Sequence, residues 1–250
     1  MGVCSEVLGE IYGKDPTFFD KLPNKIEAYI NLGIDGSMME FGDMGYGIPY
    51  KVISKDLFVD GWGDIFSYSA RVHTSYKGAF YVGGYLTTPG KYEEFHKEFP
   101  MPEPSDWRIN AIPIYREALK ASKDDFFIAP VIGGIFEPCV NPIGHANFFR
   151  YIYTNPNFIH RVLENEKKRS IEITKIFVDE GAEVVALEDD YSDKHGPQIS
   201  PKHWVQFVFP RLKEVADVCR KTGAFLVLHS CGNMEPLIQY FIEAGVDAIQ

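Results

Sequence analysis

The stretch AFLVLHSCG, residues 224–232, decides the fold of this 250-residue chain. Five apolar residues, 224–228, predict a buried strand, and His229-Ser230-Cys231-Gly232 follows at its carboxyl end. The segment 234–244 is typical of a helix that a glycine ends, and a second short strand is expected at 246–249. A strand, a helix and a strand in this order predict a parallel α/β sheet, in which ligands bind at the carboxyl ends of the strands.

His229 and Cys231 lie two residues apart, and on an extended backbone side chains with this spacing point to the same side. Imidazole nitrogen and thiolate sulfur are ligands that zinc takes in a tetrahedron. A packed cysteine beside an ordinary histidine gives the same pattern, so the position at a strand end is what favours a metal site. We therefore predict that His229 and Cys231 are metal ligands that face a common cavity.

Three acidic residues, Glu188, Asp189 and Asp190, follow a second apolar run at 184–187. Adjacent carboxylates repel one another, and a cation or a basic partner relieves that cost. We predict catalytic roles for Glu188 and Asp190 in the cavity of His229, with Glu188 as the best internal candidate for a further metal ligand. The alternative is a solvated acidic turn that caps a helix. Because consecutive parallel units are usually neighbours, 184–187 should lie beside 224–228.

Short apolar runs alternate with helical patterns along the whole chain, and both an open doubly wound sheet and a (β/α)8 barrel fit this order. A single domain spanning 1–250 is expected. Residues 42–90 are rich in Gly, Tyr and Asp and predict loops with a short β-hairpin, inserted over a pocket. The strand at 246–249 has no following helix to cover it, so we expect the barrel to be incomplete at the C-terminus, with later strands missing.

Composition excludes several classes of function. A formal net charge of −10 argues against a nucleic-acid partner, whose phosphates need a basic surface. The sequence has no run of 18 apolar residues and no secretory signal, so no membrane association is expected. Four cysteines at irregular spacing do not form a disulfide framework, which fits a reducing cytoplasmic location.

Three blocks resemble the uroporphyrinogen decarboxylase superfamily, and most closely its corrinoid-linked methyltransferase branch. The block 226–250, LVLHSCGNMEPLIQYFIEAGVDAIQ, resembles the motif in which a strand, H-x-C-G, a helix and G-x-D follow one another. The second and third blocks are Glu188-Asp189-Asp190 with Ile199-Ser200-Pro201 and Phe209-Pro210-Arg211-Leu212, and Asp60-Gly61-Trp62-Gly63 with Gly83-Gly84-Tyr85. Between the two architectures, the resemblance implies the (β/α)8 TIM-type barrel.

The resemblance also implies a chemistry. Zn2+ held by His229, Cys231 and a further cysteine from a later strand would serve a methyltransferase, and a partner protein would carry a corrinoid (cobalamin) cofactor. The methyl group would move between that corrinoid protein and a small methylated substrate, or a thiol or folate acceptor. The direction of transfer stays open, and a homodimer is compatible with the family.

Two alternatives remain at this point. The first is a true uroporphyrinogen decarboxylase, which uses no metal and holds the carboxylates of its substrate with arginines near the N-terminus. This chain has no arginine before Arg71, which counts against that function. The second is a non-catalytic barrel that binds a ligand or a partner.

Overall fold

The computed structural model describes residues 5–41, 49–68, 79–123 and 125–250. Its central element is a set of parallel strands in which β1 pairs with β6, and β10 lies between β7 and β11. A parallel bridge between Val131 and Ala186 joins the end of β6 to β7. The strands are β1 (Gly36–Met39), β6 (Phe127–Pro130), β7 (Val184–Glu188), β10 (Phe225–His229) and β11 (Ala248–Ile249).

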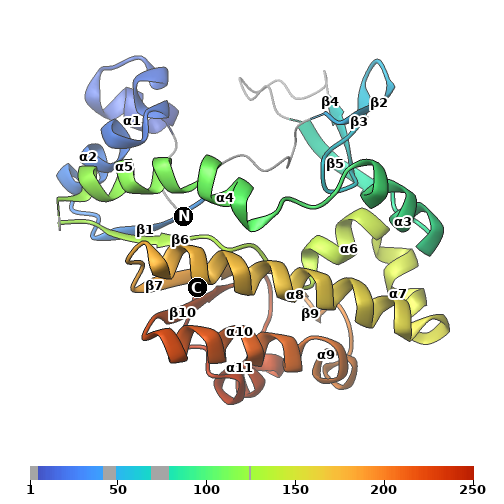
Figure 1. Cartoon of the computed structure of the whole chain (residues 1–250). Helices are drawn as coiled ribbons and strands as arrows, with labels where there is room; N and C mark the ends of the chain where they lie inside the picture. Colours follow the sequence, from blue (N-terminus) through green and yellow to red (C-terminus); the bar gives the residue numbers. More distant parts are fainter. Residues whose placement is uncertain (1–4, 42–48, 69–78, 124) are drawn as a thin grey trace.

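The order of these strands in space is their order in the chain, which decides between the two predicted architectures. A doubly wound sheet reverses its strand order at a switch point, whereas a (β/α) barrel adds each new strand on the same side. The helices that precede or connect these strands follow the same order, because α2 packs on α5, α8 on α10, and α10 on α11 (Figure 1). These helices are α2 (Leu22–Asn31), α5 (Ile112–Ser122), α8 (Pro156–Asp179), α10 (Phe209–Thr222) and α11 (Ile238–Ala244).

Local sequence signals set the ends of these helices. The Asn155 side chain accepts a hydrogen bond from the Phe158 amide at the start of α8, and Pro156 occupies the first turn. Pro210 falls in the first turn of α10 and interrupts the helical stretch there, because α9 (Pro201–Phe207) ends and α10 begins around Val208. Gly223 ends α10 in the left-handed region, at φ 80°.

The region predicted as loops with one hairpin contains more regular structure than expected. Four antiparallel strands pair in chain order, β2 (Lys51–Ser54), β3 (Leu57–Val59), β4 (Asp64–Tyr68) and β5 (Ala79–Gly84). Strands as short as these, among so many glycines and tyrosines, do not show a clear alternation of apolar and polar residues, so the sequence revealed only the hairpin-like part. Residues 42–48 and 69–78 of the predicted insertion lie outside the described residues.

The antiparallel sheet β2–β5, called the insert sheet below, packs on the helix that follows β6. Both β4 and β5 contact α6 (Glu137–Ile143), which starts close to the carboxyl end of β6 (Figure 1). The remaining elements are α1 (Ser5–Tyr12), η1 (Pro16–Asp20), α3 (Pro89–Glu98), α4 (Pro104–Asn110), α7 (His145–Thr154), β8 (Ser192–Asp193), β9 (Gly196–Pro197) and η2 (Glu235–Leu237). The insert sheet is therefore fixed next to the end of the parallel sheet where sites form.

The two middle strands of the parallel set, β7 and β10, share a fully buried face. Val185 and Leu187 of β7 and Leu226 and Leu228 of β10 are each 0% exposed, as expected where helices cover one face and neighbouring core side chains fill the other. Apolar side chains at the starts of β6 and β10 and in β11 do reach solvent, since Phe127, Phe225 and Ile249 are 46%, 57% and 41% exposed. Within the described ranges, no helix is both long enough and apolar enough to cross a membrane.

Candidate metal centre and pocket

The carboxyl ends of β7 and β10 lie side by side. The parallel register pairs Leu187 with Leu228 and Glu188 with His229, which confirms that the two predicted strands are neighbours. The Asp189 amide donates to the His229 carbonyl at 3.0 Å, so the pairing continues for one residue beyond β7. The two polar segments of the sequence therefore meet at one edge of the sheet.

Three donor side chains gather at this edge. Atoms of Asp190, His229 and Cys231 that could bind a metal all lie within 4.8 Å of one another. Cys231 Sγ is 3.7 Å from His229 Nε2. A tetrahedral zinc ion, with bonds of about 2.3 Å to sulfur and about 2.0–2.1 Å to nitrogen, would hold these two atoms about 3.6 Å apart. We call Asp190, His229 and Cys231 the donor triad.

Hydrogen bonds orient each member of the donor triad. Nδ1 of His229 lies 2.8 Å from Oε1 of Gln250, an acceptor, so Nδ1 carries the proton and Nε2 keeps its lone pair toward Cys231. The Cys231 amide donates to Asp190 Oδ1 at 2.7 Å. Gln198 Nε2 donates to the Asp190 carbonyl at 2.8 Å, which fixes the backbone of that residue. The triad is thus held by its surroundings before any metal binds.

Two further contacts fix the loop that carries Cys231. The hydroxyl of Ser230, which is 4% exposed, accepts a hydrogen bond from the Tyr191 amide at 2.9 Å and so ties the two strand ends together. Gly232 has φ +89°, and a Cβ atom there would lie 2.6 Å from the Asp193 carbonyl oxygen. Only glycine fits this turn, because a side chain would meet backbone.

The three consecutive acids have three different environments. Asp189 is fully buried, and its carboxylate accepts hydrogen bonds from the amides of Ile135, Phe136 and Glu137 at 2.7–3.1 Å, at the start of α6. Burial raises the pKa of Asp189 to about 7, and these amide donors oppose the rise. Asp189 is therefore a structural anchor between β7 and α6. The alternative of a solvated acidic cap is thus wrong about solvation, since Asp189 is 0% exposed, and right that this acid caps a helix.

Glu188 and Asp190 both line the pocket, as predicted, but they differ in their relation to the donor triad. Asp190 belongs to it, whereas Glu188, the sequence-based choice for a further ligand, does not. The reason is the register: Glu188 is still part of β7 and pairs with His229 across the sheet, whereas Asp190 lies beyond the strand end, beside Cys231. Burial, followed by the charge of Glu40, raises the pKa of Glu188.

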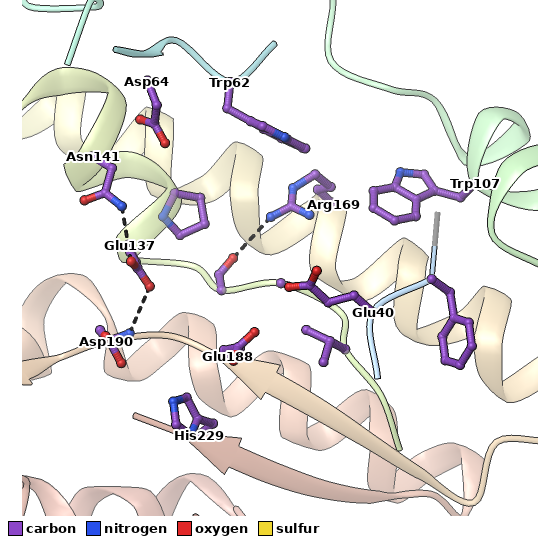
Figure 2. Close-up of a pocket in the computed structure, with 15 residues that line it drawn as sticks. Glu40, Trp62, Asp64, Trp107, Glu137, Asn141, Arg169, Glu188, Asp190 and His229 are labelled. Atoms are coloured by element: carbon purple, nitrogen blue, oxygen red, sulfur yellow. Dashed lines mark hydrogen bonds between the residues drawn. The ribbon is translucent and has the colours of Figure 1, made fainter. Parts of the chain in front are cut away.

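A cavity of about 380 Å³ opens beside the donor triad (Figure 2). Figure 2 shows Glu188, Asp190 and His229 on the side of the strand ends, with Asp64 of β4 and Trp62, from the turn between β3 and β4, across from them. The described residues that line it are Glu40, Phe41, Trp62, Asp64, Trp107, Val131, Gly133, Gly134, Glu137, Pro138, Asn141, Arg169, Glu188, Asp190 and His229. The insert sheet and α6 thus form the wall opposite His229. The prediction that Cys231 faces the same cavity is wrong in this respect, because Cys231 is exposed at its edge and is not among these lining residues.

Glu137 connects the start of α6 to the strand ends. One of its carboxylate oxygens accepts a hydrogen bond from Asn141 Nδ2 at 3.2 Å, and the other accepts one from the Asp190 amide at 3.4 Å. Burial, and then the charge of Asp190, raises the pKa of Glu137. Glu137 therefore borders both the pocket and the donor triad.

Sequence reasoning missed most of the pocket wall. Glu40, Asp64, Trp107, Glu137 and Arg169 were not predicted, because each comes from a different segment and none belongs to a motif. Trp62, which belongs to the third block that resembles the family, also lines the pocket. The other two described cysteines, Cys139 and Cys219, are buried and lie outside the donor triad.

Comparisons with known proteins agree with this architecture. Among solved structures, a methyltransferase from Methanosarcina mazei superposes with a TM-score of 0.67 over 100% of this chain and 68% of its own, at 19% sequence identity. At that identity the likeness shows a shared fold alone. The comparison with curated proteins gives no match. The sequence model named uroporphyrinogen decarboxylase (URO-D) matches residues 75–250, so the expected TIM-type fold is confirmed and the chain belongs to the URO-D family.

Proposed function

We propose that this chain is a zinc-dependent methyltransferase that moves a methyl group between a corrinoid protein and a small methylated substrate or methyl acceptor. One observation carries the proposal: the 3.7 Å between Cys231 Sγ and His229 Nε2, with a carboxylate oxygen of Asp190 within 4.8 Å of both. The fold shared with a methyltransferase from Methanosarcina mazei supports the reaction class.

The donor set fits zinc better than other common ions. Calcium and magnesium take oxygen ligands, whereas a thiolate, an imidazole and one carboxylate suit a borderline-soft ion. Three protein ligands leave one position of a tetrahedron open, which is the arrangement of catalytic rather than structural zinc. When bound, zinc would supply Lewis-acid stabilisation of a thiolate or of the heteroatom that carries the methyl group.

The chain's own residues would position the reactants. Gln250 holds the His229 ring, and the Cys231 amide holds Asp190, so the donor atoms are oriented in advance. Glu188 and Asp190, the predicted catalytic carboxylates, face the pocket at the strand ends. We assign Asp190 to the metal and Glu188 to the substrate side of the pocket, because Glu188 lines the cavity and stands outside the donor triad.

The decarboxylase alternative fits this pocket poorly. A substrate with several carboxylates needs a basic pocket, and five of the described lining side chains are carboxylic acids. Arg169 is the one guanidinium among them, and it is paired with Glu166 at 2.7 Å. A non-catalytic barrel remains the second alternative, and an activity assay separates it from the methyltransferase.

The first experiment measures the metal. The purified chain, loaded with zinc and dialysed, should retain about one zinc ion per molecule. Elemental analysis by inductively coupled plasma mass spectrometry measures this. His229→Ala, Cys231→Ser and Asp190→Ala should each lower the zinc affinity, measured by competition with a chelator. His195→Ala is the matched control, because His195 is exposed and lies outside the triad. Equal zinc affinity in all four variants would exclude the donor triad as the metal site.

The second experiment measures the reaction. Zinc-loaded protein should accelerate the demethylation of free methylcobalamin by a thiol, followed by the change in corrinoid absorption, and Cys231→Ser should abolish the acceleration. The carbon–cobalt bond breaks with its electron pair left on the cobalt, which becomes cobalt(I), and the thiolate sulfur supplies the pair of the new carbon–sulfur bond, so the step needs no added oxidant or reductant. Zinc binding without any methyl transfer to or from corrinoids would favour the non-catalytic barrel.

A further inference from the structure

The pocket beside the donor triad is strongly acidic. Five carboxyl side chains line it, from Glu40, Asp64, Glu137, Glu188 and Asp190. A zinc ion would not neutralise this set. Its two charges would be balanced by Asp190 and a Cys231 thiolate, which leaves four acidic side chains around the cavity.

The one guanidinium in the described lining contributes little free positive charge. Arg169 Nε donates to Glu166 Oε2 at 2.7 Å, and the two side chains are only 10% and 6% exposed. The guanidinium also lies over the Trp62 ring, 4.9 Å from its centroid. Arg169 is thus already paired with a carboxylate behind the pocket wall, so a carboxylate on a ligand would have to compete with Glu166.

Asp64 is an independent sign that the cavity is suited to a cation. The residue is only 3% exposed, and its Oδ1 atom has no hydrogen-bond partner among the described residues. Figure 2 shows its carboxyl group directed toward the cavity, on the side of Asn141. Burial, followed by the charges of Asp60 and Glu137, raises the pKa of Asp64 to about 8. A buried oxygen without a partner is costly, and a cationic ligand would relieve that cost.

The remaining walls suit a small organic cation. Trp62 and Trp107 line the cavity from two segments, and indole rings attract cations through their electron-rich faces. The volume of about 380 Å³ lies in the range of small-molecule sites. A hydrated metal ion would not need aromatic walls, whereas a methylated cation would use both the rings and the carboxylates.

We propose that this pocket binds a small methylated onium compound, such as a quaternary ammonium ion, as the substrate of the chain. That the ligand carries a methyl group rests on the proposed function. That the ligand is a cation is inferred from the carboxylates and indole rings of the pocket. Loss of a methyl group would leave the bonding pair on nitrogen, so the product is a neutral amine and no proton is needed. The new bond would take its electron pair from the nucleophilic acceptor, a reduced corrinoid in the proposed function.

The test compares three probes of the same shape and different charge. Choline is the cation, 3,3-dimethylbutan-1-ol is its neutral carbon analogue, and 3,3-dimethylbutanoate is an anion of similar size. Isothermal titration of the zinc-loaded protein should give binding of choline at least about tenfold tighter than of the alcohol, a difference of about 1.4 kcal/mol. Binding of the butanoate should be weakest. Added salt should weaken choline binding and leave the alcohol unchanged.

Variants locate the binding in this pocket. Asp64→Asn and Glu40→Gln should each weaken choline binding by about tenfold while leaving the alcohol unchanged. Glu40 is exposed, so its variant folds even if the buried Asp64 substitution does not. Asp56→Asn is the matched control, because Asp56 is exposed on the same insert sheet and outside the lining. Equal loss in Asp56→Asn would overturn the assignment to this pocket.

The outcomes separate this proposal from the methyltransferase proposal. If the alcohol or the butanoate binds as tightly as choline, or if choline does not bind at millimolar concentration, the cation pocket is wrong, whatever the zinc content. If choline binds with the expected preference to zinc-free protein and to Cys231→Ser, the cation pocket stands even where zinc binding or methyl transfer fails. The zinc content, measured on the same samples, decides separately whether the donor triad binds zinc.

Discussion

The imidazole of His229 lies between Gln250, whose Oε1 is 2.8 Å from Nδ1, and Cys231, whose Sγ is 3.7 Å from Nε2. Nδ1 is therefore hydrogen-bonded within the protein, and Nε2 is available to bind a metal. This arrangement is typical of metal-binding histidines, whose far nitrogen donates to an oxygen that fixes the ring. The relationship comes from the end of β10 and the end of β11, which pair in parallel.

Gln250→Ala should lower zinc affinity without unfolding the protein. Loss of the acceptor at Nδ1 frees the ring of His229 to rotate and to change tautomer, and outer-shell changes of this kind cost about 10- to 100-fold in metal affinity. Competition with a chromogenic chelator measures the effect. Gln239→Ala is the control, since Gln239 is exposed and bonds only to Glu243 in the described structure. Unchanged affinity in Gln250→Ala would show that this contact does not orient His229.

Gly232→Ala should destabilise the protein more than Gly181→Ala. Both glycines have a positive φ, +89° and +93°, which costs an alanine about 1–2 kcal/mol. At Gly232 the new Cβ would also lie 2.6 Å from the Asp193 carbonyl oxygen, whereas at Gly181 nothing lies within 4 Å. We expect the free energy of unfolding in urea to fall further for Gly232→Ala, and its zinc affinity to fall as Cys231 moves. An equal loss of stability in both variants would contradict the close approach at Gly232.

Asp189→Asn should lower the free energy of unfolding by about 2–4 kcal/mol, because it removes a buried carboxylate that accepts three backbone amides. The amide nitrogen of asparagine would face one of these donors. Chemical denaturation measures the loss. Asp190→Asn is the paired variant: it should weaken zinc binding and change stability by less, since Asp190 is only half-buried. The reverse order of effects would mean that the two residues have been assigned the wrong roles.

The parallel sheet was predictable because its strands are continuous apolar runs. The runs 184–187 and 224–228 fall on β7 and β10, and the neighbour rule for parallel units places them together. His229 and Cys231 could be found because they follow such a run directly. Their spacing of two residues predicted a shared face, and the structure brings their donor atoms together.

The opposite wall of the pocket could not be predicted in the same way. Asp64 lies on a short antiparallel strand, and Arg169 lies in the middle of α8, so their approach to Glu188 depends on how the insert sheet packs on α6. Such contacts between distant segments leave no periodic signal in a single sequence. The sequence favoured Glu188 as the further ligand, whereas Asp190 belongs to the donor triad, because Asp190 lies two residues beyond Glu188, past the end of β7.

The last prediction concerns the pH dependence of stability. In the folded chain burial raises the pKa of Asp64 from 3.8 to about 8, so between these values the folded state keeps a proton that the unfolded state has lost. The unfolded state then binds fewer protons, and the contribution of Asp64 to the free energy of unfolding falls as pH rises, by at most about 1.4 kcal/mol per pH unit. Below pH 3.8 both states are protonated, and above about 8 both are ionised, so the dependence stops at each limit.

Asp64→Asn removes this titration, and the variant should therefore gain stability relative to the parent chain as pH is raised from 5 to about 8. Urea denaturation at several pH values measures the difference. Asp56→Asn, on the same sheet and exposed, should show no such trend. Choline should reduce the trend in the parent chain, because a cation beside Asp64 favours the ionised carboxylate and lowers its pKa. A constant difference between Asp64→Asn and the parent across this range would show that Asp64 is ionised in the folded protein, with a partner for its Oδ1 atom.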